Sequence, residues 1–250
     1  MTEGPTRVAL VTGSSRGLGR AIAARLARDG CAVAVNGFHE DGPLAQAARA
    51  IREDGGVAEA FVADVTDEAS VAGMVAAIAD RLGPVDILVL NATGPQPDLP
   101  VDATTWDDHL GQLRFFVASP VVVGRAVLDG MRRRGWGRVV HVDSEVSDRV
   151  PADRSAYVTA KSAQLGLMRS WAVELAPHGI TVNAVAPGFI PVQRHEAVAP
   201  EVLARCVATV PAGHMGTPAD IADAVSFFAS EGASFVTGQR VVVDGGRGLL

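Results

Sequence analysis

The sequence predicts one doubly wound α/β domain of the Rossmann type, with a parallel sheet of about seven strands and helices on both faces. Short valine-rich runs recur along the 250 residues, and longer segments with helical spacing of apolar residues separate them. No internal repeat, linker or low-complexity stretch interrupts this alternation. Because most of the apolar runs barely alternate with polar residues, their strands are expected to be buried on both faces, as in a parallel sheet covered by helices.

Seven apolar runs are the predicted strands. All of them have the length of an ordinary strand, and valine is frequent in most. They span residues 7–12, 31–36, 58–64, 85–91, 137–143, 180–187 and 240–246.

Three of the intervening segments carry the clearest helix signals. In residues 17–30, Ile22 and Leu26 share a face and Gly30 ends the helix. Residues 66–83 begin at a capping residue, either Thr66 or Asp67. Residues 155–179 form the longest predicted helix, which is closed by a proline and a glycine.

Composition and charge exclude several classes of protein. Hydrophobic residues make up 48% of the chain, enough for a sizeable core, and the formal charge of -6 with no long basic run argues against nucleic acid or an anionic membrane as partner. The polar start MTEGPTR and the short apolar run after it do not resemble a signal peptide, so a cytoplasmic protein is expected. Cys31 and Cys206 lie far apart without metal-ligand spacing; both are expected to be small buried residues, and no metal site is predicted.

A glycine-rich loop joins the first predicted strand to the first predicted helix. It reads TGSSRGLG over residues 12–19, with glycines at Gly13, Gly17 and Gly19. Glycine allows a tight turn and a close approach of the backbone to a diphosphate, and the helix amino terminus offers unpaired N–H groups. Three glycines alone also fit a simple tight turn, but their place after the first strand of an α/β chain favours a dinucleotide-binding loop.

The chain contains one tyrosine, Tyr157, and one lysine, Lys161, four residues apart in the long predicted helix. Residues four apart lie on one face of a helix, so both side chains can serve one pocket. A free phenol has a pKa of about 10, and a nearby ammonium group favours the phenolate. A packed aromatic residue beside a solvated lysine is the alternative interpretation of this pair.

These motifs resemble those of the short-chain dehydrogenase/reductase family. The loop matches the family's TGxxxGxG pattern, Asn91-Ala92-Thr93-Gly94 resembles its NNAG segment, and Ser144, Tyr157 and Lys161 match its catalytic serine and YxxxK pair. Residues 183–188, NAVAPG, match the segment that holds the nicotinamide end of the cofactor. The match covers nearly the whole chain. Within the family, the sequence most resembles 3-oxoacyl carrier-protein reductases and actinobacterial polyketide ketoreductases.

The resemblance implies a reductase that transfers hydride to a carbonyl carbon while Tyr157 donates a proton to the carbonyl oxygen. It implies that Ser144 orients the carbonyl oxygen by a hydrogen bond. It also implies that Lys161 binds the ribose of the nicotinamide and lowers the pKa of Tyr157. The implied cofactor contacts, beyond Tyr157 and Lys161 themselves, are Gly13, Ser15, Arg16, Gly17, Leu18, Gly19, Asn36, His39, Asp64, Val65, Asn91, Ala92, Thr93, Pro187, Gly188 and Ile190.

The cofactor is predicted to be NADP(H). An NAD-specific fold places an acidic residue at the end of the second strand, where it binds the ribose 2′-hydroxyl and repels a 2′-phosphate. Here that position reads VNGFH, with no acid before Glu40. Arg16 stands where NADP-binding relatives often carry a basic residue, so Arg16 and either Asn36 or His39 are expected near the phosphate; a solvated charge at the helix start is the alternative for Arg16.

The chain departs from the family pattern in three places. No asparagine occurs between residues 92 and 182, although relatives use one before the fifth strand to place a water; the local sequence is QLRFF over residues 112–116, in a helix about three residues longer than usual. Asp143 and Glu145 flank Ser144, either to contact substrate or as a solvated loop edge. The turn after Gly188 lacks the usual threonine, and backbone groups near Ile190 are expected to replace it.

The resemblance implies a substrate lid at about residues 189–211. A wide apolar pocket beneath it favours a bulky, polyketide-like or polycyclic aromatic ketone over a small sugar. Val173 occupies a position where fatty-acid enzymes often carry an arginine for the acidic carrier protein, which favours a free polyketide-like ketone of secondary metabolism over a 3-oxoacyl carrier-protein substrate. A catalytically idle NADP-binding sensor is the remaining alternative, and a homotetramer or homodimer is expected by resemblance. The candidate substrate residues, each aromatic also fitting the core, are Pro95, Phe115, Phe116, Glu145, Val146, Phe189 and Val192.

Overall fold

The computed structural model describes residues 6–40, 42–193 and 199–249. Within these ranges seven parallel strands form one sheet in the order β3-β2-β1-β4-β5-β6-β7. The predicted doubly wound architecture is therefore confirmed. The strands are β1 (Val8–Val11), β2 (Ala32–Gly37), β3 (Val57–Val62), β4 (Val85–Leu90), β5 (Gly137–Val142), β6 (Ile180–Pro187) and β7 (Arg240–Val243).

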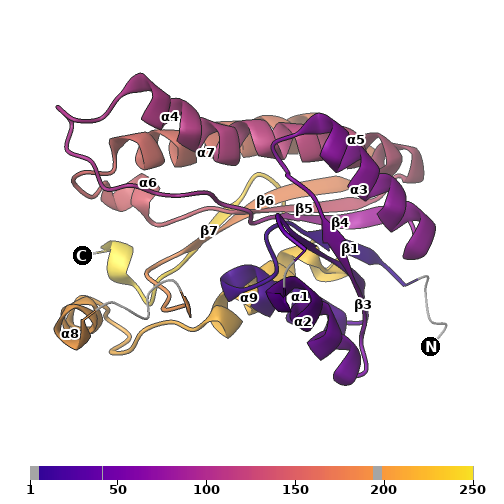
Figure 1. The fold of residues 1–250 in the computed structure, drawn as a ribbon, viewed down its shortest axis with the longest axis horizontal. Coiled ribbons are helices and arrows are strands. Elements are labelled where there is room, and N and C mark those ends of the chain that lie inside the picture. The colour runs from indigo at the N-terminus through magenta and orange to yellow at the C-terminus, as the bar shows by residue number, and fades with distance from the viewer. Residues whose placement is uncertain (1–5, 41, 194–198, 250) are drawn as a thin grey trace.

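Helices cover both faces of the sheet, as Figure 1 shows. One layer contains α1 (Gly17–Arg28), α2 (Gly42–Glu53) and α9 (Pro218–Ala229). The opposite layer contains α3 (Glu68–Arg81), α5 (Ser119–Arg134) and α7 (Ser155–Leu175). The remaining helices are α4 (Trp106–Leu113), the π-helix η1 (Arg114–Ala118), α6 (Val146–Arg149), α8 (Pro200–Ala208) and the 3₁₀ helices η2 (Ala176–His178), η4 (Glu231–Ala233) and η5 (Arg247–Leu249).

The hydrophobic core consists of two layers, one on each face of the sheet. Every residue of β1, β2, β4, β5 and β6 is buried, which is why their sequences show no polar alternation. The edge strands behave differently: Val57 and Val62 of β3 and Val241 and Val242 of β7 are exposed. The prediction of burial on both faces thus holds for the inner strands and is wrong at the two edges, where one neighbour is missing.

Local chemistry explains most helix boundaries. The side chain of Asp67, and not that of Thr66, caps α3 by accepting a hydrogen bond from Ser70 N at 2.7 Å. Helix α1 ends at Arg28, two residues before Gly30 adopts a left-handed φ of 91°. Helix α7 ends at Leu175, earlier than predicted, and the 3₁₀ turn that follows leads to Gly179 with a φ of 70°.

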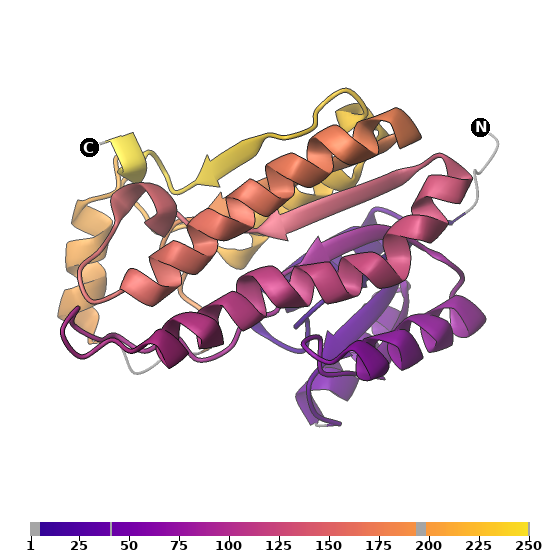
Figure 2. The same ribbon diagram turned by 90° about the horizontal axis from the view of Figure 1, so that it is seen from above.

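The helices α4, η1 and α5 form one continuous stretch, Trp106–Arg134. This stretch lies beside α7 on the same face of the sheet (Figure 2). By length and composition alone, this stretch could cross a membrane. Val123 and Met131 of α5 are completely buried in the core layer, which gives the apolar residues a partner inside the fold. Its composition is therefore that of a core helix.

The strand order reverses direction at β1, whose neighbours β2 and β4 continue the sheet on opposite sides. The loops that follow these strands diverge there and leave a crevice at the carboxyl ends of the strands, the usual place for a nucleotide in such sheets. The helices α8 and η5 lie at that same end of the molecule (Figure 1).

Candidate functional site

One large cleft opens at the carboxyl ends of the strands. Its volume is about 1620 Å³, and its lining extends from the glycine-rich loop to the segment before α7. Ser144, Tyr157 and Lys161 line the cleft together with the loop glycines, so residues nearly 150 positions apart meet in one site. A cleft of this size can hold a dinucleotide and a substrate at once.

The glycine-rich loop fits closely against the segment after β4. A Cβ atom on Gly13 would lie 2.8 Å from Ala92 Cα, and Gly13 has a φ of 62°. A Cβ atom on Gly19 would lie 2.5 Å from both Asn91 Nδ2 and Gly13 O. Both positions therefore require glycine, one for its conformation and both for space.

Two asparagines fix this loop from below. Asn36 is 2% exposed; its Oδ1 accepts from Gly13 N at 3.1 Å, and its Nδ2 donates to Phe61 O and Ala63 O at 3.3 Å each. Asn91 Nδ2 donates to the carbonyl oxygens of Thr12 and Gly13 at 2.9 and 3.0 Å. Asn36 lines the cleft as predicted, and because these amides are occupied by the backbone, both asparagines also support the loop.

Ser14 is a supporting residue that the sequence analysis missed. Its buried hydroxyl donates to Val11 O at 2.7 Å and accepts from Asn36 N at 3.0 Å, which ties the loop to both β1 and β2. The signal that could have found it was its small hydroxyl at the strand-to-loop junction, a position where a side chain can replace a missing backbone partner.

Helix α1 starts at the cleft without a capping side chain. Its N-cap residue, Arg16, makes no side-chain capping hydrogen bond, and its first turn contains no acidic residue. By contrast, side chains cap α3 at Asp67, α4 at Thr105 and α9 at Thr217. The open amide groups and partial positive charge of α1 thus suit a diphosphate, and the exposed Arg16 lies on the cleft lining beside them.

The residues expected to hold the rest of a nucleotide are mostly on the lining. Asp64, whose Oδ1 accepts from Thr66 N at 2.8 Å, lies there with its neighbour Val65. His39 is exposed and outside the lining; its neighbour Phe38 occupies that part of the cleft wall. The structure therefore does not bring His39 to the site. The other expected cofactor residues on the lining are Gly13, Ser15, Gly17, Leu18, Gly19, Asn91, Ala92, Thr93, Pro187, Gly188 and Ile190.

Tyr157 and Lys161 occupy one face of α7, as their spacing predicted. Lys161 is 3% exposed, and its Nζ donates to Val142 O at 2.8 Å and to Gln164 Oε1 at 3.0 Å. Gln164, one turn further along the helix, was not singled out from the sequence, although its i, i+3 spacing from Lys161 was visible there. Two oxygen acceptors compensate the burial of the ammonium group and fix its direction.

An aromatic ring lies where the asparagine was expected. The α4–α5 stretch contains the π-helix η1, a rare element that is frequently found at functional sites. In η1, Phe116 is 3% exposed; its ring centre lies 5.4 Å from that of Tyr157 and 4.0 Å from Lys161 Nζ. Gln112 is directed elsewhere, because its Nε2 donates to Pro95 O at 2.7 Å. A phenyl face thus lies beside the ammonium group.

The acids beside Ser144 are buried and paired, so neither is a solvated loop edge. Arg240 Nε binds Asp143 Oδ2 at 2.6 Å, and Arg247 Nη1 binds Glu145 Oε1 at 2.8 Å. Burial raises the pKa of Asp143, opposed by Lys161 and by Arg240. Burial likewise raises the pKa of Glu145, opposed mainly by Arg247.

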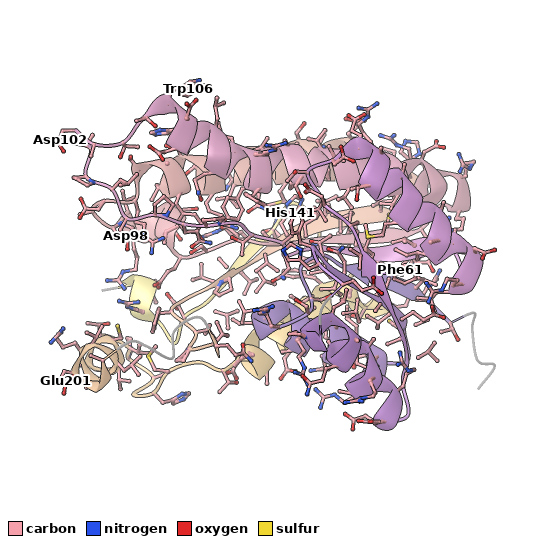
Figure 3. All side chains as sticks on the ribbon, viewed as in Figure 1. Phe61, Asp98, Asp102, Trp106, His141 and Glu201 are labelled. Atoms are coloured by element: carbon pink, nitrogen blue, oxygen red, sulfur yellow. The ribbon has the colours of Figure 1, made fainter. Side chains whose placement is uncertain are left out.

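A buried histidine lies behind this group. His141 is 0% exposed on β5, between the sheet and α7 at the centre of Figure 3, and its ring is edge-on to Trp171 at 5.8 Å. Burial, with a smaller contribution from Lys161, lowers the pKa of His141 to about 3. The residue is therefore neutral at ordinary pH and adds no charge beneath Lys161.

The substrate end of the cleft combines apolar and charged residues. All seven sequence-predicted substrate residues, from Pro95 to Val192, line the cleft. Arg114, Arg149 and Arg154 line it too, and Arg154 is paired with Asp98, which Figure 3 labels on the loop before α4. Cys206, expected in the core, is half-buried on the cleft lining because α8 lies outside the core layers; Cys31 is buried as predicted.

Comparisons with known proteins give a consistent picture. The model of the family described as enoyl-(acyl carrier protein) reductase matches residues 13–247. The 3-oxoacyl-[acyl-carrier-protein] reductase FabG of Vibrio cholerae is 39% identical over 246 residues, 98% of each chain. A putative gluconate dehydrogenase from Agrobacterium tumefaciens has a similar structure, with a TM-score of 0.92, 34% identity and coverage of 98% of this chain and 96% of that one.

A gluconate 5-dehydrogenase from Burkholderia cenocepacia, whose structure is a complex with NADP and tartrate, has a TM-score of 0.90 at 32% identity and covers 98% of this chain and 96% of its own. The similarity to each of these proteins extends over nearly the whole of both chains.

Proposed function

Because the chain belongs to the short-chain dehydrogenase/reductase family, we propose that it is an NADPH-dependent reductase that transfers hydride to a ketone, with Tyr157 as proton donor. The observation that carries this proposal is the meeting of Ser144, Tyr157 and Lys161 in one cleft with the uncapped start of α1. An NADP complex of the Burkholderia relative supports the choice of cofactor.

The residues present fit this cofactor. The open amides of α1 and the tight loop around Gly13 suit the diphosphate, and Arg16 offers a cation for a 2′-phosphate. No acidic residue of β2 opposes that phosphate. When bound, NADPH supplies the hydride for the reaction.

The side chains of the chain itself handle the proton. Tyr157 Oη would donate its proton to the carbonyl oxygen of the substrate, and Ser144 Oγ would donate a hydrogen bond that orients this oxygen. Lys161 would hold the cofactor ribose and favour the phenolate that Tyr157 becomes. Its fixed hydrogen bonds to Val142 O and Gln164 Oε1 keep the ammonium group from turning away.

For the substrate we propose a bulky, polyketide-like ketone that is free and not attached to a carrier protein. Phe115, Phe189 and Val146 contribute an apolar wall, and Val173 is 79% exposed on α7, so no cation is offered to an acidic carrier at that position. Residues 189–211 are the proposed substrate lid; its residues 194–198 lie outside the described ranges. The similarity to FabG supports a second candidate, a 3-oxoacyl carrier-protein substrate.

The location and assembly remain proposals as well. We place the enzyme in the cytoplasm, like a soluble reductase, and we expect a homodimer or homotetramer. The exposed apolar residues Val241 and Val242 on the edge strand β7 and Val173 on α7 support an interface between copies. Light scattering after size exclusion would measure the assembly directly.

The test is oxidation of NADPH by the purified protein with a fused bicyclic ketone, with an acetoacetyl carrier-protein thioester, and, in reverse, reduction of NADP by the protein with gluconate. The proposal predicts the highest kcat/KM for the bicyclic ketone. The variant Tyr157→Phe should lose about 10²- to 10⁴-fold in kcat while it binds NADPH as before. Tight NADPH binding without turnover of any of the three compounds would indicate a sensor, and a preference for the thioester would establish the second candidate.

A further inference from the structure

A single arginine side chain contacts both sides of Ser144. Arg240, the first residue of β7, binds Asp143 Oδ2 through Nε at 2.6 Å and Asp148 Oδ2 through Nη1 at 2.5 Å. Its Nη2 donates to the backbone oxygen of Ser144 itself at 2.8 Å. The guanidinium therefore holds residues 143–148 in one conformation, with Ser144 between the anchored positions.

The sheet places this arginine on the same face as Lys161. Arg240 pairs in register with Ala184 of β6, and Ala184 pairs with His141 of β5. Neighbouring residues in register project from the same face of a sheet, and His141 contacts Trp171 of α7 on that face. Because Ala184 is small, the long side chain of Arg240 can extend from the edge strand past β6 to the end of β5.

The ion pair between Arg240 and Asp143 also affects how strongly the charge of Lys161 acts on Tyr157. Asp143 is 4% exposed, and its Oδ1 accepts no hydrogen bond from a described residue. The two cations that stabilise its carboxylate are Lys161 and Arg240. Without Arg240, the carboxylate would keep Lys161 as its cation, and the field of Lys161 at Tyr157 would be offset by a nearby negative charge.

We propose that Arg240 is a positioning residue of the active site, which fixes the backbone of Ser144 and neutralises Asp143 so that the charge of Lys161 acts on Tyr157. This inference rests on the proposed function for the roles of Ser144 and Tyr157. Three further charged or titratable groups lie around these residues: Asp148, which Arg240 also binds; His141 from β5, which is neutral; and Arg154, just before α7, whose guanidinium lies 5.6 Å from the centre of the Tyr157 ring.

The composition of the chain permits a direct test. Tyr157 is the only tyrosine, so the ultraviolet difference signal of phenolate formation reports this residue alone in the protein without cofactor. Its midpoint is the apparent value of the coupled Tyr157–Lys161 pair. Arg240→Gln should raise this midpoint by about 0.5 to 1 pH unit, because the carboxylate of Asp143 then lacks one of its two cations. Asp143→Asn should lower it, because the negative charge beside Lys161 is then removed, while Arg240 keeps Asp148 as its partner.

The double variant Asp143→Asn/Arg240→Gln should return the midpoint close to that of the unmodified protein, since both charges are absent. Arg132→Gln is the matched control: it removes one positive charge from the exposed pair with Glu174 and should leave the midpoint unchanged. In reductase assays, Arg240→Gln should lower kcat about tenfold, with partial recovery in the double variant.

An unchanged midpoint in folded Arg240→Gln, or a midpoint that the double variant fails to restore, would overturn the inference even if the enzyme reduces ketones. If Arg240→Gln does not fold, Asp143→Asn decides alone: a lowered midpoint supports the inference, and an unchanged or raised one contradicts it. Absence of turnover by the unmodified protein would contradict the proposed function, while the titration would still report on the charges around Lys161.

Discussion

The two loops that border the cleft are held in different ways. The glycine-rich loop at the nucleotide end is fixed by neutral amides and hydroxyls, chiefly Asn36, Asn91 and Ser14. The Ser144 loop at the reaction end is fixed by ion pairs, Asp143 with Arg240 and Glu145 with Arg247. The loop that is to receive an anion contains no acid to repel it, whereas the reaction end depends on charges whose balance changes with pH.

The difference predicts that a change of pH has little effect on the glycine-rich loop, and that this loop is disturbed instead when a substitution removes its hydrogen bonds or adds atoms where there is no space. The charged end should fail through changes in the ionisation of a few groups. Four substitutions test this contrast, from the largest expected effect to the smallest.

Asn36→Leu should lower the free energy of unfolding by about 2–4 kcal/mol. The change leaves the partly buried Gly13 N–H and the carbonyl oxygens of Phe61 and Ala63 without the hydrogen bonds from Asn36, and an unsatisfied polar group away from water is costly. Urea unfolding measures the loss, with the exposed Gln46→Leu on α2 as control. A loss below about 1 kcal/mol would show that the amide of Asn36 is not what holds the loop.

Gly19→Ala should weaken NADPH binding about 10- to 100-fold. The added Cβ would lie 2.5 Å from Gly13 O and 2.8 Å from Ser14 Cα, so the loop backbone itself must shift. Fluorescence titration with NADPH measures the affinity. Gly73→Ala on α3 is the matched control because nothing lies within 4 Å of its added Cβ. Equal affinity of the two variants would mean that the loop tolerates the shift.

Arg16→Ala should reduce the preference for NADPH over NADH about tenfold. The exposed guanidinium at the start of α1 is the cation expected at the 2′-phosphate, while NADH has no group there for it to bind. Dissociation constants for both cofactors give the ratio. Arg20→Ala, one turn along α1 and off the cleft lining, is the control. An unchanged ratio would leave Arg16 as a solvated helix-start charge.

Asp143→Asn should change how stability depends on pH. Burial raises the folded-state pKa of Asp143 above its unfolded value of about 3.9, so its contribution to stability is complete below that pH and is lost as pH rises through the folded pKa. The unmodified protein should therefore lose stability relative to the variant as pH increases from about 4. Urea unfolding across this range measures the difference.

A substitution of opposite sign serves as the control for this pH series. The hydroxyl and backbone N–H of Thr105 bind Asp108, the capping-box residue of α4, and lower its pKa. Its contribution is present above the unfolded pKa and lost as pH falls, so Asp108→Asn should lose stability relative to the unmodified protein as pH rises. Parallel pH curves for Asp143→Asn and Asp108→Asn would contradict the assigned direction for one of them.

Patterns of neighbouring residues predicted the fold and part of the candidate site. The glycine-rich loop, the Asp67 cap and the shared face of Tyr157 and Lys161 each depend on residues within a few positions of one another, and their geometry follows from backbone conformation and helix period. The valine-rich runs predicted that the strands exist. They did not predict that β3 and β7 are partly exposed, because the position of a strand at an edge depends on which strands pair.

The amino-acid sequence by itself determined the parallel α/β architecture, the nucleotide loop and the tyrosine–lysine pair. Only the tertiary structure decided that Asp143 is buried against Arg240, 97 positions away, that the ring of Phe116 packs against Lys161, and that Cys206 lines the cleft. Partners so distant are brought together by strand order and helix packing, and a pattern of neighbours contains no information on which distant side chain will compensate a buried charge.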